Sequence, residues 1–187
     1  YVQEVGLNIN KIYGSVFGGG KIGETEIERD DTSIKVWEDI FKGYGIDAKY
    51  GKGERIQPFV DKNWWGLPGG GPCGPCSEIF YDTGKEACGS NCNINCNCGK
   101  FVEIGNNVFM HYLKESNGNI KTLGRHNVDF GGGLVRIVAL LQGVDSVYET
   151  DIFKPIYDNV KSLSVNQIEE SQRVITDHLN SAAWIVM

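Results

Sequence analysis

The sequence predicts an α+β fold in which an antiparallel sheet is flanked by helices. Residues 101–115 and 119–123 are strand-like and flank Asn117-Gly118, a dipeptide typical of tight hairpin turns. Later segments space their apolar residues as helices do. Because hairpin strands are followed by helices, this order favours an antiparallel sheet over a parallel βαβ array.

The first elements are a strand and a helix. Residues 11–17 alternate apolar and polar positions, as expected for a strand. After the cap candidates Asp31 and Thr32, helical spacing begins at Ile34, and Gly43 is expected to end that helix.

A glycine–proline segment and three helices complete the prediction. Residues 71–76 read Gly-Pro-Cys-Gly-Pro-Cys and are interpreted as a rigid turn, because the prolines fix φ and the glycines adopt angles that other residues avoid. Helices are predicted for residues 134–141, after the cap candidate Thr150, and from residue 167 onward.

Composition narrows the class of protein. The 187 residues are 41% hydrophobic, enough for one domain with a sizeable core. The net charge of −6 argues against a basic surface of its own for nucleic acid. No apolar run reaches the roughly 18 residues that span a bilayer, so no membrane partner is expected and a cytoplasmic location is predicted. A reducing compartment favours thiols over disulfides.

Six cysteines form two groups. Residues 83–99 are interpreted as an insertion loop, whose four thiols are numerous enough for the tetrahedral shell of a structural Zn²⁺. The candidate metal ligands are Cys88, Cys92, Cys96 and Cys98. Cys73 and Cys76 are interpreted instead as small buried residues of the turn.

Two glycine clusters suggest phosphate binding, and they differ in context. Residues 18–23 satisfy the G-x-G-x-x-G pattern, but the acidic stretch that follows favours a hairpin tip. Residues 127–136 join a strand to a helix through three glycines, which would leave backbone amides bare where anions bind. Arg136 could then reach a phosphate. The alternative is a glycine turn beside a surface arginine.

Residues 71–82, preceded by Asn63-Trp64-Trp65, resemble the catalytic domain of the alanyl-tRNA synthetase family of class II aminoacyl-tRNA synthetases. The segment 127–136 is similar to class II motif 3. The resemblance spans the chain but only the later half of a catalytic domain, because motifs 1 and 2 have no counterpart upstream. It implies a partial catalytic core at 1–165 and the start of the tRNA-recognition helices at 166–187.

The resemblance also implies residue roles. Arg136, with Gly133 beside it, would bind ATP and offset charge at the γ-phosphate with Mg²⁺. Asp129 would hold the ammonium of alanine, and Asn106 would orient the carboxylate side. The alanine pocket implied by the family comprises Trp65, Asn106, Val108, Asp129 and Gly131. Each of these side chains taken alone is more typical of ordinary packing.

Several positions depart from the family pattern. The residues concerned are Gly69, Gly70, Gly105, Phe130, Gly132 and Val135, of which Gly105 replaces a tryptophan, Phe130 a threonine, Gly132 a methionine and Val135 a glutamate. They are interpreted as losses of active-site side chains.

The implied partners are alanine, ATP and tRNA(Ala), the last through regions largely outside this chain. Homo-oligomerisation is allowed by the resemblance. The predicted function is alanine–tRNA ligation, with the isolated chain expected to be inactive. Two alternatives remain open: a non-catalytic synthetase paralogue that binds an amino acid, and a zinc-dependent interaction module.

Overall fold

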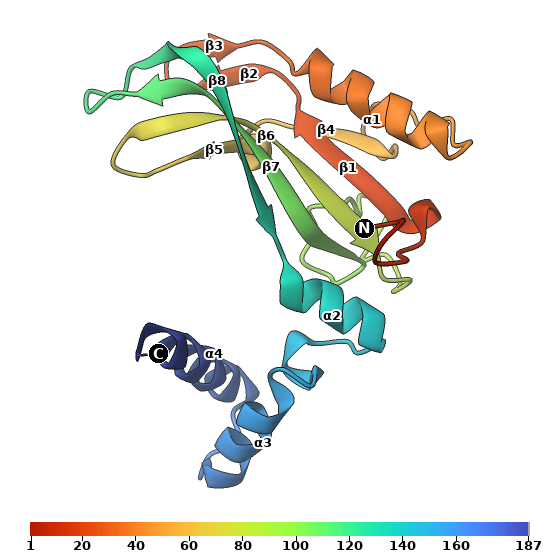
Figure 1. The fold of residues 1–187 in the computed structure, drawn as a ribbon, viewed down its shortest axis with the longest axis vertical. Helices are drawn as coiled ribbons and strands as arrows, with labels where there is room; N and C mark the ends of the chain where they lie inside the picture. The colour runs from red at the N-terminus through yellow and green to blue at the C-terminus, as the bar shows by residue number, and fades with distance from the viewer. Residues whose placement is uncertain (187) are drawn as a thin grey trace. The chain divides into compact units, whose positions relative to one another are not determined.

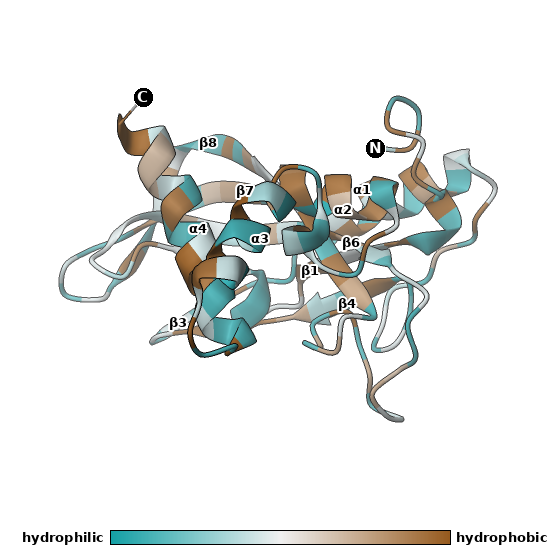
Figure 2. Cartoon of the chain, turned by 90° about the horizontal axis from the view of Figure 1, so that it is seen from below, coloured by the Kyte–Doolittle hydropathy of each residue, from teal (hydrophilic) through white to brown (hydrophobic). Residues whose placement is uncertain are grey.

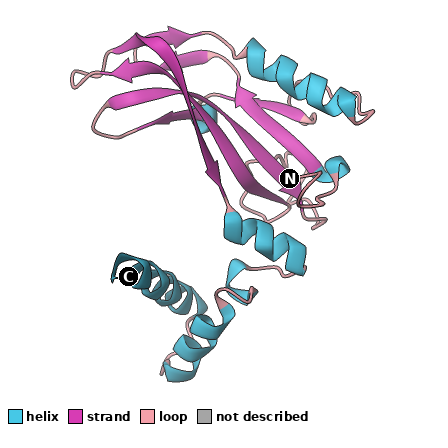
Figure 3. Ribbon diagram, viewed as in Figure 1, coloured by secondary structure: helices cyan, strands magenta, loops and turns pink. Residues whose placement is uncertain are grey.

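The computed structural model describes residues 1–186, which form two compact units divided after Gly133. The first unit is a sheet with one long helix, and the second is helical (Figures 1 and 3). The α+β class is therefore confirmed. The predicted boundary after residue 165 concerns the family's catalytic domain and stays a prediction.

One sheet dominates the first unit, with strand order β4-β1-β6-β7-β8, and β5 pairs with β6 as well. The strands are β1 (Ile12–Phe17), β4 (Ile56–Phe59), β5 (Trp64–Gly66), β6 (Gly71–Asp82), β7 (Phe101–Lys114) and β8 (Ile120–Gly132). All pairs are antiparallel except β1 with β4, which is parallel. The predicted antiparallel sheet is thus confirmed, with one parallel pair at this edge.

Helix α1 (Asp31–Gly43) packs on the sheet beside β1 (Figure 1). Trp37 and Phe41 join Ile12 and Val16 in a buried core. Burial of such side chains contributes about 1.5–3 kcal/mol each. Helical spacing thus identified the buried face, although two apolar residues of this helix, Val36 and Ile40, remain exposed.

The cap of α1 differs from the prediction by one residue. The carboxylate of Asp30, not Asp31 or Thr32, accepts a hydrogen bond from the Ser33 backbone N–H at 2.9 Å and another from the Ser33 hydroxyl at 2.6 Å. Asp30 is the N-cap because only it lies three residues before an unsatisfied amide of the first turn.

The segment 71–76 is not a turn, and here the prediction was wrong. Gly71–Asp82 forms one continuous strand, β6, which pairs with β5 on one side and β7 on the other. Its two prolines lack an N–H. Pro75 lies where the pairing register shifts, between Cys73 and Cys76, whereas Pro72 pairs with Leu113 near the start of the strand. Pairing on both sides therefore overrides the local preference for a turn.

The hairpin around Asn117-Gly118 is confirmed. Strand β8 extends well beyond the predicted 119–123 and carries residues 127–132 as sheet. The first glycine cluster lies at a smaller hairpin, β2 (Gly20–Ile22) with β3 (Thr25–Ile27), as expected.

The second unit contains α2 (Leu134–Gln142), α3 (Lys154–Leu163) and α4 (Glu169–Val186). Helices α3 and α4 pack on each other. Thr150 ends a short 3-10 helix at Val147–Glu149, and the N-cap of α3 is Phe153, so the predicted cap lies three residues too early.

Several apolar side chains of α4 are exposed, including Leu179 and Trp184. Figure 2 shows that hydrophobic and hydrophilic residues alternate along this helix. Within residues 1–186, no helix has the length and apolar character needed to cross a membrane.

Candidate active site

Two neighbouring strands, β7 and β8, place four of the five predicted pocket residues on one face of the sheet. Val108 on β7 pairs with Asp129 on β8, and Asn106 pairs with Gly131. On the other side of β7, Val108 is opposite Cys76 and Asn106 is opposite Glu78. Directly opposed residues of antiparallel strands point to the same side. The result is a patch of two rows, Cys76-Val108-Asp129 and Glu78-Asn106-Gly131, which we call the pocket face.

The pocket face combines charge with a small apolar wall. Val108 is buried, whereas Asp129 is exposed at the open end of its row. The Asp129 carboxylate accepts a hydrogen bond from the Phe130 backbone N–H at 2.9 Å, which orients it. A fixed anion beside a small apolar side chain suits a short ligand that carries an ammonium group.

Trp65, the fifth predicted residue, lies on β5 and pairs with Gly74. Strand β5 flanks β6 on the side away from β7, so Trp65 is two strands from Val108, about 10 Å in the direction of strand pairing. Trp65 is half-buried. It therefore borders the pocket face instead of belonging to its two rows.

Beside the pocket face, toward β1, lies a buried polar cluster that the sequence did not reveal. The Asn63 side-chain amide donates to the Ser15 hydroxyl at 2.7 Å and to the Cys76 carbonyl at 3.1 Å. The Ser15 hydroxyl in turn donates to a Glu78 carboxylate oxygen at 3.1 Å. Both Asn63 and Ser15 are fully buried. Buried polar groups joined in this way hold their neighbours in one arrangement.

The run of three glycines does not form a loop of bare amides. Gly131 and Gly132 pair with Asn106 and Gly105 as part of β8, and the Gly133 N–H donates to the Ile104 carbonyl at 3.0 Å. The Gly133 amide is used by the sheet, so the expectation of an open amide cradle was wrong at Gly133. Arg136 is the third residue of α2, is exposed, and belongs to the second unit.

Three departures from the family pattern lie together on the opposite face of the sheet. Gly105 pairs with Gly132, and both alternate with the pocket-face residues Asn106 and Gly131. A Cβ atom built on Gly105 would lie 3.1 Å from the ring of Phe130, and one built on Gly132 would lie 3.2 Å from it. The Phe130 ring therefore covers both glycines. These three positions therefore lie on the face opposite the pocket face, and their interpretation as losses of active-site side chains stays a prediction.

The departures near residue 70 belong to a turn. Gly70 has φ of +94°, and a Cβ there would lie 2.9 Å from the Lys114 carbonyl oxygen. A side chain at this position would be strained and would also collide with backbone. Gly70 is thus needed for the close approach of the chain to the end of β7.

The four loop cysteines converge in space. The sulfurs of Cys88, Cys92 and Cys96 lie within 4.8 Å of one another, and the sulfur of Cys98 is 3.7 Å from that of Cys92. A tetrahedral zinc site with Zn–S bonds of about 2.3 Å has sulfur–sulfur edges of roughly 3.8 Å. The spacing therefore suits a divalent metal.

Protonation in the thiol cluster is uneven. The pKa of Cys98 is lowered, first by a hydrogen bond from the Lys100 backbone, whereas the pKa of Cys88 is raised to about 12, first by its hydrogen bonds to the other sulfurs. Crowded sulfurs thus resist a second negative charge. A bound cation would remove that penalty.

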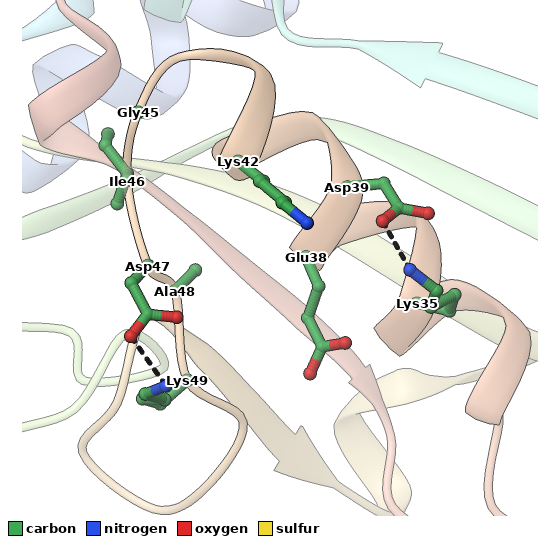
Figure 4. A pocket seen from close by; sticks show the side chains of 9 residues that line it. All are labelled: Lys35, Glu38, Asp39, Lys42, Gly45, Ile46, Asp47, Ala48 and Lys49. Carbon is green, nitrogen blue, oxygen red and sulfur yellow. Dashed lines mark hydrogen bonds and ion pairs between the residues drawn. The ribbon is translucent and has the colours of Figure 1, made fainter.

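Two hollows lie away from the pocket face. One, of about 670 Å³, is on the opposite face of the sheet between α1 and β8, where His111 and His126 stack with ring centroids 4.0 Å apart. Burial, and then repulsion from His126, lower the pKa of His111. The other hollow, about 530 Å³, lies beside the C-terminal half of α1, with ion pairs Lys35–Asp39 and Lys49–Asp47 on its wall (Figure 4). In each pair the lysine neutralises the charge of the aspartate.

Sequence reasoning missed Asn63, Glu78 and the histidine pair. Asn63 was noted only as part of the segment before β6. No local pattern indicates that it is buried and donates a hydrogen bond to Ser15 of β1. Each histidine is the sequence neighbour of a member of the pair Met110–Asn127, and continuing that register places His111 opposite His126. Such cross-strand neighbours follow from register alone.

The antiparallel sheet and its pocket face agree with one family of enzymes. The family described as tRNA synthetases class II (A) matches residues 6–187. The chain belongs to this family of enzymes.

Among curated proteins, the chain is similar to alanine–tRNA ligases. It is 46% identical to that of Borreliella burgdorferi and 42% identical to that of Treponema denticola, over 96% and 97% of this chain. The enzyme of Natranaerobius thermophilus is 48% identical over 84% of the chain. The chain spans 30% of the length of the first two relatives and 18% of the third.

Proposed function

We propose that this chain supplies the amino-acid pocket of an alanine–tRNA ligase, which activates alanine with ATP and transfers it to tRNA(Ala). The observation that carries the proposal is the pocket face, where Asn106, Val108, Asp129 and Gly131 occupy adjoining positions on two paired strands. The names of the relatives support alanine as the substrate. A cytoplasmic location and homo-oligomerisation remain part of the proposal.

Each pocket residue has a role suited to its position. Asp129 pairs with the ammonium of alanine, and Val108 and Trp65 limit the size of the side chain. Asn106 contributes a side-chain amide, and Gly131 leaves room where a larger residue would fill the pocket. The glycine at 131 meets no atom within 4 Å of a built Cβ, so that space is open.

ATP and Mg²⁺ belong to the proposal through the second unit. Arg136 is exposed near the start of α2, where a guanidinium suits the γ-phosphate, and Gly133 precedes that helix without a side chain. Because the Gly133 amide is already bonded, its contribution is space and not a hydrogen bond. When bound, Mg²⁺ would neutralise charge on the phosphates.

Alanine-dependent exchange of pyrophosphate into ATP tests the proposal. The full-length gene product should catalyse exchange with alanine, and Asp129→Asn should reduce kcat/KM for alanine by at least tenfold, since a charged hydrogen bond is worth about 1.5–3 kcal/mol. Asp145→Asn is the matched control, because it removes one carboxylate from the other unit. Alanine binding without exchange would instead support the non-catalytic paralogue.

The thiol cluster completes the proposed cofactor set. Cys88, Cys92, Cys96 and Cys98 would bind one structural Zn²⁺, which orders a loop that has little apolar content. The backbone N–H of Asn93 already donates to the Cys96 sulfur at 3.4 Å, a hydrogen bond that stabilises a thiolate.

Metal content provides the test. Purified protein should hold about one Zn²⁺ per chain, and Cys96→Ser should lose it. Cys73→Ser is the matched control, because Cys73 is buried in β6 and outside the cluster. Equal zinc content in all three proteins would refute the site.

A further inference from the structure

The polar cluster beside the pocket face ends in a carboxylate on that face. The Ser15 hydroxyl accepts hydrogen bonds from the Asn63 side-chain amide at 2.7 Å and from the Glu78 backbone N–H at 3.3 Å. A hydroxyl has a single proton to donate, and that of Ser15 goes to Oε2 of the Glu78 carboxylate, 3.1 Å away. Both Ser15 and Asn63 are fully buried. The fold therefore orients the Glu78 carboxylate before any ligand binds.

Glu78 lies on the pocket face at some distance from Asp129. Glu78 pairs with Asn106 on β7, and two residues further along β7, Val108 pairs with Asp129 on β8. With strands about 4.8 Å apart and about 3.4 Å per residue, the Cα atoms of Glu78 and Asp129 are about 12 Å apart. The ammonium and carboxylate of alanine are separated by less than about 4 Å. An alanine whose ammonium is bound by Asp129 is therefore too short to reach Glu78 as well.

The polar residues of the pocket face follow the order of the groups in alanyl-adenylate. In the proposed function Asp129 binds the ammonium and Asn106 serves the carboxylate side, and Glu78 lies beyond Asn106 on the next strand. In the adenylate, the carboxyl group is followed by the α-phosphate and then by the ribose. A carboxylate repels a phosphate but accepts hydrogen bonds from hydroxyl groups, as acidic residues do from ribose in dinucleotide-binding folds. The ribose hydroxyls are thus the groups that suit Glu78.

We propose that Glu78 binds a ribose hydroxyl of ATP, and that Ser15 is a positioning residue that directs the Glu78 carboxylate toward the sugar. The presence of ATP and the placement of alanine rest on the proposed function. Ser15 itself touches no substrate. Its hydroxyl holds one carboxylate oxygen of Glu78, so that the carboxylate keeps one orientation when the sugar binds.

Ser77 offers a matched control for Ser15. Its hydroxyl is also buried, accepts a hydrogen bond from the Trp37 indole N–H at 2.8 Å and donates to the Ser15 backbone carbonyl at 2.8 Å. Because side chains alternate along a strand, Ser77 and Glu78 point to opposite faces of the sheet. Ser77→Ala therefore removes a buried hydroxyl next to Glu78 without removing a hydrogen bond from its carboxylate.

Pyrophosphate exchange by the full-length gene product, measured with ATP, 2′-deoxy-ATP and 3′-deoxy-ATP, tests the inference. Wild type should lose about tenfold in kcat/KM with the analogue that lacks the bound hydroxyl, and Glu78→Ala should lose about as much with ATP itself. In Glu78→Ala that analogue and ATP should differ by less than about twofold, because the partner of the hydroxyl is already gone. Ser15→Ala should lower the preference for ATP about threefold, with KM for alanine unchanged, while Ser77→Ala should keep the wild-type preference.

Two outcomes would overturn the assignment. One is the same preference for ATP over both analogues in wild type and Glu78→Ala, which would mean that the carboxylate acts on another group, such as a cation. The other is the same preference in Ser15→Ala and Ser77→Ala, a comparison that decides alone if circular dichroism shows that Glu78→Ala does not fold.

Absence of alanine-dependent exchange in wild type would count against the proposed function instead. Calorimetric binding of ATP and of the two deoxy analogues to wild type and Ser15→Ala would then test the role of Glu78 directly. A weaker preference for ATP in Ser15→Ala would support that role. Equal preference in the two proteins, or no binding of ATP to wild type, would overturn it.

Discussion

The contact between Phe130 and Gly105 predicts a coupled pair of substitutions. Gly105→Ala would place a Cβ 3.1 Å from the Phe130 ring and 2.9 Å from the Tyr1 hydroxyl, both closer than ordinary contact. Tyr1 donates to the Ile104 carbonyl at 2.8 Å and can move with its flexible side chain. The ring of Phe130 is the harder obstacle. We expect Gly105→Ala to lower the free energy of unfolding by about 1–3 kcal/mol, as overpacking does.

Removing the ring should relieve most of that cost. Phe130 is 52% exposed, so Phe130→Ala alone should cost only about 1 kcal/mol of transferred apolar surface. In the double variant the added methyl group enters space that the ring has left. The free energy lost should therefore be smaller than the sum of the single losses by about 1 kcal/mol.

Urea unfolding of the four proteins, followed by circular dichroism, measures this coupling. Gly124→Ala supplies the control, because a Cβ on Gly124, also in β8, meets no atom within 4 Å. Its effect should add to that of Phe130→Ala. Additivity of Gly105→Ala with Phe130→Ala, within about 0.3 kcal/mol, would refute the claim that the Phe130 ring occupies the space that a side chain at position 105 would need.

Two further predictions concern a helix cap and a buried thiol. Asp30→Ala should lower the free energy of unfolding by about 1 kcal/mol, while Asp31→Ala should change it by less than half as much; equal losses by urea titration would contradict the assignment of the cap. Burial raises the pKa of Cys76 above that of an unfolded thiol, to about 12, so its contribution to stability is full below about pH 8.5 and is lost as pH rises toward 12. The free energy of unfolding, measured from pH 8.5 to 11, should therefore fall less steeply with pH in Cys76→Ala than in wild type, by up to about 1.4 kcal/mol per pH unit. Parallel curves for the two proteins would argue against a buried, protonated thiol.

Local signals in the sequence predicted helices and a hairpin turn correctly, but they did not predict which strands pair. Asn117-Gly118 identified the hairpin, and helical spacing identified α1 and α4, because these depend on neighbours within a few residues. The segment 71–76 was misassigned because glycine and proline favour turns locally, whereas hydrogen bonding with β5 and β7 holds the chain extended.

The candidate site shows the same limit. The resemblance suggested Asn106, Val108 and Asp129, but their arrangement in rows follows from strand register, which the sequence does not state. The sequence suggested separate losses of side chains at Gly105 and Phe130, whereas the structure places the Phe130 ring next to Gly105 on the neighbouring strand. Cys76 was interpreted as part of a turn, whereas pairing with Val108 of β7 places it in strand β6.

The connection between β6 and β7 is fastened at its base. The Thr83 backbone N–H donates to the Lys100 carbonyl at 2.8 Å, its hydroxyl donates to the Gly99 carbonyl at 2.8 Å, and Lys100 pairs with Asp82 at 3.1 Å. These bonds close the strands before the cysteines begin. The insertion loop, residues 83–99, therefore leaves and rejoins the sheet at one point. Its length can change at little cost in loop entropy while β6 and β7 keep their alignment. A peptide tag or fluorophore placed there would report on the protein without disturbing amino-acid recognition.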